Sequence, residues 1–374
     1  MPEKLTVTND MRETMNRVIS KSKTYFKGII AAFAVVIVAC STVKAPSTNQ
    51  DTERFSWVSS EPLILPPTDA NQKIFGVKDP SIVYFDNKYH VFMTTAGEKG
   101  WGLAYTSFSE WSEAPTAPII GLDKSAIGSG YRAAPQVFYF APQKLWYLIY
   151  QGGDPLYSTS HDISDPMSWS VPKPFFKVIP ELVKHDDGYN AWLDFWNICD
   201  EKDCYLFFTN DYGDFFRAQT SLEQFPNGFH NTTKIMSGRR DDLFEASNTY
   251  HIAGTHNYLT LIEAIGPKGR YFRAWVSNSL AGEWHPLTSD PMNVFAHSDN
   301  MSFRGRIWSE GVSHGEMIRY SVDQTLAIDP CKPLQYLYQG LDKEEGKSYE
   351  YIESPYLLGV ITANLANPIS KMCK

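Results

Sequence analysis

Three acidic residues stand within otherwise apolar segments of this 374-residue sequence. They are Asp79, Asp194 and Glu245, and a charge buried in such a segment is costly unless a partner or a reaction requires it. Hydrolysis of a glycosidic bond needs a protonated acid at the leaving oxygen and an ionised carboxylate that activates water or attacks the sugar. A third carboxylate raises the pKa of a neighbouring acid by repulsion of like charge. The trio is therefore a candidate acid–base centre, and the alternative is a set of unrelated acids that cap turns at strand ends.

The three acids occur at comparable places in five repeated segments. Each segment has an apolar strand with a polar residue near its start, an aromatic-rich strand, a further strand and a turn. The polar residues at this place are Asp79, Gln136, Asp194, Glu245 and His314, with separations of 57, 58, 51 and 69 residues. A repeat of about this length with roughly four strands is typical of a propeller blade. The sequence therefore predicts an all-β fold, a five-bladed β-propeller, whose inner strands bring these residues together; a β-sandwich is the alternative.

The composition agrees with such a fold and limits the partners. Hydrophobic residues make up 43% of the chain and aromatic residues 14%, which indicates a large core rich in strand-favouring side chains. Residues 1–39 hold six basic and three acidic residues, so the rest of the chain is more acidic than the net charge of −8 suggests. Nucleic-acid binding requires clustered lysine and arginine and is not expected. Neutral sugars or small molecules are the expected partners.

An apolar run at residues 28–40 follows three lysines. The run is shorter than the ~20 residues of a bilayer span and predicts a secretory signal peptide. Its end, Ile37-Val38-Ala39-Cys40, resembles a bacterial lipobox, in which the cysteine thiol is lipidated; an ordinary signal peptide is the alternative. We expect an exported protein that touches a membrane only through a lipid anchor at Cys40. The expected organisation is a signal peptide over residues 1–40, a polar linker over residues 41–67 and the propeller over residues 68–374.

Besides Cys40, the chain has four cysteines, which allow three pairings. In an exported protein we favour disulfides between Cys199 and Cys204 and between Cys331 and Cys373. A zinc site is the competing hypothesis, but no Cys-x-x-Cys spacing or histidine pairing supports it.

Several ordered motifs extend from about residue 70 to about residue 365. They are Lys78-Asp79-Pro80-Ser81, residues 193–200, residues 210–213, Leu243-Phe244-Glu245-Ala246, residues 269–273, Ser313-His314-Gly315-Glu316, and Asp329-Pro330-Cys331 followed by residues 337–340. Together they resemble glycoside hydrolase family 62, whose members are α-L-arabinofuranosidases that remove arabinose side chains from arabinoxylan. Family 43 shares the five-bladed fold and the acid trio and is the nearest family with which this sequence could be confused.

The resemblance implies a role for each member of the trio. Asp79 corresponds to the general base and Glu245 to the general acid, while Asp194 orients Glu245 and tunes its acidity. Asp200 is the rival for the role of Asp194, although it fits a turn-capping residue better. Because the family inverts the anomeric carbon, Asp79 would activate water on one face of the sugar while Glu245 protonates the leaving oxygen on the other.

The resemblance also implies sugar-binding residues and a metal ion. Lys78, Arg273, Tyr338 and Gln339 are expected to hydrogen-bond the arabinose ring, and Gln136 is a further candidate. His314 is expected beside a structural metal ion, usually calcium (Ca2+), on the propeller axis, with water in most of the coordination shell. Calcium prefers oxygen ligands, so a histidine as the only protein ligand would be unusual. The alternative for His314 is a hydrogen-bonded core histidine.

Exposed aromatic residues are expected at the rim of the pocket, because sugar rings present apolar faces. Candidates are Trp101, Tyr189, Trp192 and Tyr338, whereas Trp111, Trp169 and Trp284 recur at unit ends and are expected to pack the blades. The resulting interpretation is a monomeric, inverting α-L-arabinofuranosidase that acts on arabinoxylan or arabinan side chains. Two alternatives stay open, a family 43-like β-xylosidase or arabinanase and a catalytically silent sugar-binding propeller at the cell surface.

Overall fold

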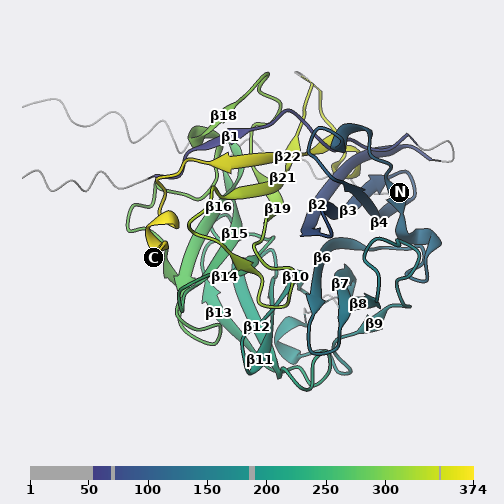
Figure 1. Cartoon of the computed structure of the whole chain (residues 1–374), viewed down its shortest axis with the longest axis vertical. Coiled ribbons are helices and arrows are strands. Elements are labelled where there is room, and N and C mark those ends of the chain that lie inside the picture. Colours follow the sequence, from purple (N-terminus) through teal and green to yellow (C-terminus); the bar gives the residue numbers. More distant parts are fainter. Residues whose placement is uncertain (1–53, 69–71, 185–189, 345–346) are drawn as a thin grey trace, which may run out of the picture. The chain divides into compact units, whose positions relative to one another are not determined.

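The structure is a computed structural model and describes residues 54–68, 72–184, 190–344 and 347–374. Five mostly antiparallel sheets make up this part of the chain (Figure 1), and they are the five blades of a β-propeller. The described residues contain no α-helix. The helical segments are short 3-10 turns: η2 (Ala114–Thr116), η3 (Leu122–Lys124), η4 (Glu181–Val183), η5 (Ser298–Asn300), η6 (Tyr351–Glu353) and η7 (Ser370–Met372). The predicted fold class is confirmed.

The first three blades are each built from four consecutive strands, with the first strand innermost. Blade one consists of β2 (Ile74–Phe85), β3 (Lys88–Gly97), β4 (Gly100–Phe108) and β5 (Ile120–Gly121). Blade two consists of β6 (Ala133–Phe140), β7 (Leu145–Gly152), β8 (Asp154–Ser160) and β9 (Lys173–Pro174). Blade three consists of β10 (Leu193–Cys199), β11 (Asp203–Thr209), β12 (Asp214–Ser221) and β13 (His230–Ser237).

Blades four and five depart from this simple order. Blade four consists of β14 (Asn248–Ile252), β15 (Tyr258–Gly266), β16 (Gly269–Ser277) and β17 (His285–Pro286), with β20 (Ala327–Ile328) paired in parallel beside β14. Blade five consists of β19 (Ser313–Met317), β21 (Gln335–Leu341), β22 (Tyr356–Ala363), β1 (Trp57–Ser59) and β18 (Met301–Phe303). The pairing of β1 with β22 closes the ring, because it joins strands from the two ends of the propeller in one sheet.

The position of β1 corrects one predicted boundary. Residues 41–67 were expected to form a polar linker, yet Trp57 is fully buried and pairs with Ala363. The propeller therefore begins before residue 68. The predicted signal peptide and Cys40 lie outside the described residues. Within the described residues, no helix is long and apolar enough to cross a membrane.

Both predicted disulfides are present. Cys199 and Cys204 join β10 to β11, and Cys331 is bonded to Cys373 near the end of the chain. The core lies between neighbouring blades and is strongly aromatic. Trp169 packs edge-on against Phe92 of blade one, as expected for a residue that packs the blades.

The innermost strands of blades one, two, three and five have a β-bulge near the axis, where their pairing register with the next strand is broken. In blade four, β14 pairs with β15 without such a break. Four residues at or beside these places have left-handed backbone angles: Asp79 (φ 46°), Ala134 (φ 49°), Asp194 (φ 56°) and Ala246 (φ 55°). Residues other than glycine rarely adopt this conformation, and bulges commonly redirect side chains beside active sites. The bulge also corrects the repeat alignment, because Ala134, and not Gln136, is the counterpart of Asp79 and Asp194.

Each blade donates a backbone N–H near the axis to a side chain of the preceding blade. The five hydrogen bonds, which we call the hub ring, run from Asp79 to Gln339 Oε1 (2.7 Å), Ala134 to Thr94 Oγ1 (2.8 Å), Asp194 to Gln151 Oε1 (2.9 Å), Ala246 to Asp194 Oδ2 (2.9 Å) and His314 to Glu263 Oε2 (2.8 Å). The hub ring therefore fixes each inner strand relative to its neighbour and satisfies buried donors that the bulges take out of the strand ladder.

The hub ring predicts that Gln339→Ala destabilises the propeller. The change removes the acceptor for the buried Asp79 N–H and the donor to Ser313 Oγ. We expect the free energy of unfolding to fall by about 1–3 kcal/mol in urea titrations, because a buried polar group is left without a partner. Gln335→Ala on the same strand is the matched control, since Gln335 is only partly buried and makes one long contact with Thr362. Equal losses for the two variants would contradict the prediction.

Candidate active site

A cavity of about 270 Å³ lies where the inner strands approach one another. Five of the predicted site residues line it: Lys78, Asp79, Asp194, Glu245 and His314. The three acids therefore meet in one pocket, although they are far apart in the sequence. Asp200, the rival of Asp194, does not line the pocket, and its carboxylate accepts hydrogen bonds from Lys202 N and Asp203 N in a turn.

Asp79 lies beside a buried lysine. Lys78 Nζ is 3.9 Å from Asp79 Oδ1 and donates a hydrogen bond of 3.0 Å to Tyr351 Oη. The ammonium also lies over the rings of Trp101, Tyr351 and Tyr356, at 4.7 to 5.2 Å from their centroids. Burial opposes the charged form, but Lys78 and His314 outweigh it and hold the pKa of Asp79 well below its usual range. Asp79 is thus held ionised, as a general base requires.

His314 lies between two of the acids. Its Nδ1 is 3.4 Å from Asp79 Oδ1 and 3.8 Å from Asp194 Oδ2. Burial raises the pKa of Asp194 to about 8; His314 opposes this shift, and Glu245 and Asp79 reinforce it. Burial lowers the pKa of His314, but Asp194 and Asp79 raise it to about 9. The two aspartates therefore differ in protonation, because each has a different set of charged neighbours.

Glu245 is held by an arginine. Arg270 Nη1 donates to the Glu245 carboxylate and to Glu263 Oε1, the latter at 2.6 Å. Glu263 is fully buried, and its other oxygen accepts from Ser313 Oγ and from His314 N of the hub ring. Arg270 and Glu263 thus connect Glu245 to Ser313 and His314 of blade five.

Arg273 does not line the pocket. Its Nη1 is 3.5 Å from Asp242 Oδ1, and its guanidinium lies over Trp275. The two arginines are three residues apart on β16, so their side chains leave opposite faces of the strand. The motif at residues 269–273 was the correct signal, but Arg270 is the residue that reaches Glu245.

Three other predicted sugar-binding residues are buried outside the pocket. Gln136 exchanges two hydrogen bonds of 2.7 Å with the backbone of Asn197 and so joins β6 to β10. Tyr338 Oη lies 2.8 Å from Ser59 Oγ, and Gln339 uses both ends of its amide, one of them in the hub ring. These side chains position strands and the Asp79 backbone.

The pocket contains residues that the sequence analysis did not select. Asp211, Tyr131, Gln151 and Tyr351 line it together with Trp101. Asp211 belongs to the motif at residues 210–213, so a signal for it was present in the sequence. The others follow no periodic pattern, because they lie on connections between strands or at strand ends. Trp192, a predicted rim residue, is buried and donates to Asp154, and Tyr189 lies outside the described residues.

The residues around His314 do not form a calcium cage. Within the described ranges, no group of three or more His, Cys, Asp or Glu side chains has the arrangement to hold a metal ion. The donors close to His314 are the carboxylates of Asp79 and Asp194, which already lie against its Nδ1. Calcium prefers six to eight oxygen ligands, and these side chains do not supply them.

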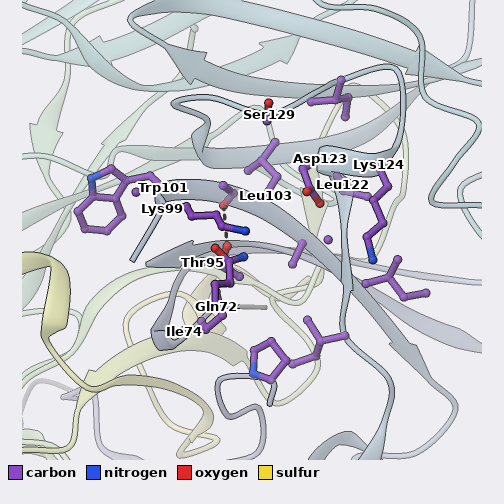
Figure 2. A pocket seen from close by; sticks show the side chains of 18 of the residues that line it. Gln72, Ile74, Thr95, Lys99, Trp101, Leu103, Leu122, Asp123, Lys124 and Ser129 are labelled. Carbon is purple, nitrogen blue, oxygen red and sulfur yellow. Dashed lines mark hydrogen bonds between the residues drawn. The ribbon is translucent and has the colours of Figure 1, made fainter. Parts of the chain in front are cut away.

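A larger cavity of about 430 Å³ adjoins the pocket and shares Trp101 with it. Figure 2 shows Trp101 on its left side and Lys124 on its right, with Leu103 and Leu122 between them. Its lining mixes apolar side chains, charged side chains and glycines. The shared tryptophan makes the two cavities neighbours on blade one.

The fold and the pocket define a class of protein. A pocket that brings several carboxyl groups together, one of them held ionised, can supply the acid and the base that a glycoside hydrolase needs. The family model described as glycosyl hydrolase family 62 matches residues 56–362. The chain belongs to glycosyl hydrolase family 62.

Individual relatives agree with this assignment. Alpha-L-arabinofuranosidase C of Cellvibrio japonicus is 38% identical over 309 residues, which are 82% of this chain and 46% of that protein. The chain thus spans about half the length of this curated relative. The catalytic domain of a Coprinopsis cinerea family 62 α-L-arabinofuranosidase is 46% identical, with a TM-score of 0.80 over 86% of this chain and 99% of that one. A family 62 hydrolase in complex with xylotriose is 42% identical, with a TM-score of 0.78 over 82% and 97% of the two chains.

The site predicts different roles for the two arginines of β16. Arg270→Met leaves the buried Glu263 without its cationic partner, so we expect a loss of about 3 kcal/mol in the free energy of unfolding. Arg273→Met, the matched control, removes a partly exposed ion pair and the contact of the guanidinium with Trp275, and it is expected to cost less than about 1 kcal/mol. Chemical denaturation of both variants checks this, and a larger loss for Arg273→Met would contradict the assignment.

Proposed function

We propose that this protein is an inverting α-L-arabinofuranosidase that removes arabinofuranosyl side chains from arabinoxylan, and that arabinan is a second substrate to be tested. The observation that carries the proposal is the meeting of Asp79, Asp194 and Glu245 in one pocket of a family 62 chain. The arabinofuranosidase activity in the names of two relatives and the xylotriose bound to a third support the substrate class.

The proposed reaction uses Glu245 as the acid and Asp79 as the base. Glu245 in its acid form donates a proton to the oxygen that links arabinose to xylose, and the bond between that oxygen and the anomeric carbon breaks with its electron pair on the oxygen. Asp79 accepts a proton from water while the water oxygen bonds to the anomeric carbon from the opposite face. The products are arabinose of inverted configuration and a xylose unit with a free hydroxyl group.

Asp194 and Lys78 support these two residues. Asp194 accepts the N–H of Ala246, the residue after Glu245, and so fixes the backbone that carries the acid. Lys78, held among three aromatic rings, keeps Asp79 ionised. Both effects place the charges before the substrate arrives, which lowers the cost of reorganisation in the transition state.

The neighbouring cavity supports a polymeric substrate. Trp101 lines both cavities, and we propose that a sugar chain whose side group enters the smaller cavity lies along the larger one. Figure 2 shows the lining of the larger cavity. Its mixture of apolar and polar lining suits pyranose rings, which present apolar faces and hydroxyl edges.

We also propose a calcium ion beside His314, with water supplying most of its oxygen ligands.

Replacing the proposed acid or the proposed base is expected to reduce arabinose release strongly. Glu245→Gln and Asp79→Asn keep the side-chain volume but remove the proton donor and the base, so activity on wheat arabinoxylan should fall by about 10²–10⁴-fold. Released sugars are measured by chromatography, and NMR of the first-formed anomer tests inversion.

Glu283→Gln is the matched control, because Glu283 is an exposed acid outside the pocket. Release of xylose without arabinose by the wild-type protein would instead support the β-xylosidase alternative. Sugar binding with no hydrolysis would support the silent propeller.

The two disulfides support the proposal that the protein is exported, since disulfides persist in oxidising compartments. We propose further that Cys40 is lipidated and that the mature protein is monomeric. Cys40→Ser is expected to move the protein from the membrane fraction to the soluble fraction, as judged by immunoblot of fractionated cells. Ser41→Ala is the control, and unchanged fractionation of Cys40→Ser would contradict the anchor.

A further inference from the structure

Tyr131 lines the pocket, and the proposed reaction assigns it no part. Its hydroxyl oxygen lies 2.5 Å from Nε2 of Gln151, and Oε1 of the same amide lies 2.9 Å from the backbone nitrogen of Asp194 in the hub ring. Gln151 is buried and lines the same pocket. A short chain of hydrogen bonds therefore connects the inner strand of blade three to the tyrosine hydroxyl.

The direction of both hydrogen bonds follows from the backbone. A backbone N–H can only donate, so the Gln151 atom that faces Asp194 N is the carbonyl oxygen, and the other atom is the amide nitrogen. That nitrogen can also only donate, so the Tyr131 oxygen accepts from it. The single hydrogen of the phenol is therefore not used in this contact. No other group of the described part of the chain forms a hydrogen bond with the Tyr131 hydroxyl.

Tyr131 keeps this hydrogen near neutral pH. Burial raises the pKa of Tyr131 to about 12, the hydrogen bond from Gln151 opposes the shift, and the charges of Asp194 and Asp79 add to it. A free donor in a polar pocket suits a sugar, because every sugar hydroxyl has an oxygen that can accept a hydrogen bond.

The backbone around Tyr131 lies where the two cavities adjoin. Gly128 (φ 74°) and Gly130 (φ 110°) have left-handed backbone angles, which favour glycine, and both line the larger cavity. Arg132 N donates to the carbonyl oxygen of Trp101 at 3.4 Å, and Arg132 Nη1 donates to that of Tyr131 at 2.7 Å. Tyr131 is thus held beside the tryptophan that lines both cavities.

We propose that Tyr131 is a specificity-determining residue whose hydroxyl donates a hydrogen bond to a hydroxyl oxygen of the arabinose. Gln151 is the positioning residue that leaves the tyrosine hydrogen free for the sugar. A site built to bind a hydroxyl group rejects an analogue that lacks it, so Tyr131 selects arabinose over a deoxy analogue. The inference rests on the proposed function, which places the arabinose in this pocket.

Tyr131→Phe removes the hydroxyl and keeps the ring. We expect kcat/KM on a xylotriose that carries one arabinose to fall about two- to tenfold, which is the effect of one neutral hydrogen bond. Tyr84→Phe is the matched control, because Tyr84 is 45% exposed against 44% for Tyr131 and lies outside the pocket. An unchanged kcat/KM in Tyr131→Phe, or an equal loss in Tyr84→Phe, would overturn the inference.

Deoxy substrates separate this contact from a structural role. Three xylotrioses are compared, whose arabinose lacks the 2-, the 3- or the 5-hydroxyl group. On the substrate without the accepting oxygen, Tyr131→Phe should cause no further loss of kcat/KM, whereas it should cause its full loss on the other two. A structural role would lower kcat/KM by the same factor on all three substrates, and that result would also overturn the inference.

Gln151→Glu tests the direction of the hydrogen bond. A carboxylate accepts from Asp194 N and also from the Tyr131 hydroxyl, so the tyrosine hydrogen is no longer free for the sugar. In the Glu245→Gln background, which prevents turnover, calorimetry gives the Kd of the arabinose-substituted xylotriose. We expect Gln151→Glu to raise this Kd and Tyr131→Phe to add nothing in the combined variant. Additive changes would contradict the role of Gln151.

The same binding measurement keeps this inference distinct from the proposed function. In the Glu245→Gln background, Tyr131→Phe should raise the Kd about two- to tenfold, and Tyr84→Phe should leave it unchanged. An unchanged Kd in Tyr131→Phe would overturn the inference, whereas a wild-type protein that binds the oligosaccharide and releases no arabinose would contradict the proposed function alone.

Discussion

The structure depends on one repeated interaction, the hydrogen bond from a backbone N–H near the axis, in four blades at a bulge, to a side chain of the preceding blade. A bulge removes a backbone donor from the strand ladder, and a buried donor without a partner is costly. In each of the five blades this donor finds an oxygen on its neighbour, at 2.7 to 2.9 Å. The same contacts that close the ring therefore set the positions of Asp79, Asp194 and His314, so stability and the geometry of the pocket have a common origin.

The pocket divides into two electrostatic halves. Asp79 faces Lys78 and His314 and is held ionised, whereas Glu245 lies among other acids, with Arg270 as the opposing cation. The surroundings of Asp79 favour its ionised form, which the proposed base requires. His314 contacts the carboxyl groups of Asp79 and Asp194, and Arg270 contacts those of Glu245 and Glu263. Each of these two side chains therefore offsets the charge of two carboxyl groups and not of one.

Much of the fold and part of the site could be predicted from the sequence. The repeat indicated the five blades, and a carboxyl group in an apolar strand made Asp79, Asp194 and Glu245 candidates, to which the resemblance to family 62 added the roles. The alignment of the five repeats was wrong at Gln136, because the bulge in β6 shifts the strand register and the hydrophobic pattern of the sequence does not show such a shift. Arg273 was preferred to Arg270 within the correct motif, since only the alternation of β16 decides which side chain faces Glu245. The linker boundary was wrong because β1 is only three residues long and finds its partner at the far end of the chain.

By itself, the sequence determined the class of fold and the acids that stand out in apolar strands, because these depend on local composition and on spacing along the chain. It favoured one of three possible cysteine pairings, which the structure contains. Only the tertiary structure decided which polar residues serve the pocket and which serve the hub. Gln151 and Glu263 have no distinctive local signal, and Gln339 lies in a motif from which a sugar-binding role was expected. Each of the three acquires its role from a backbone N–H on another blade, and neither periodicity nor composition along the chain records such a contact.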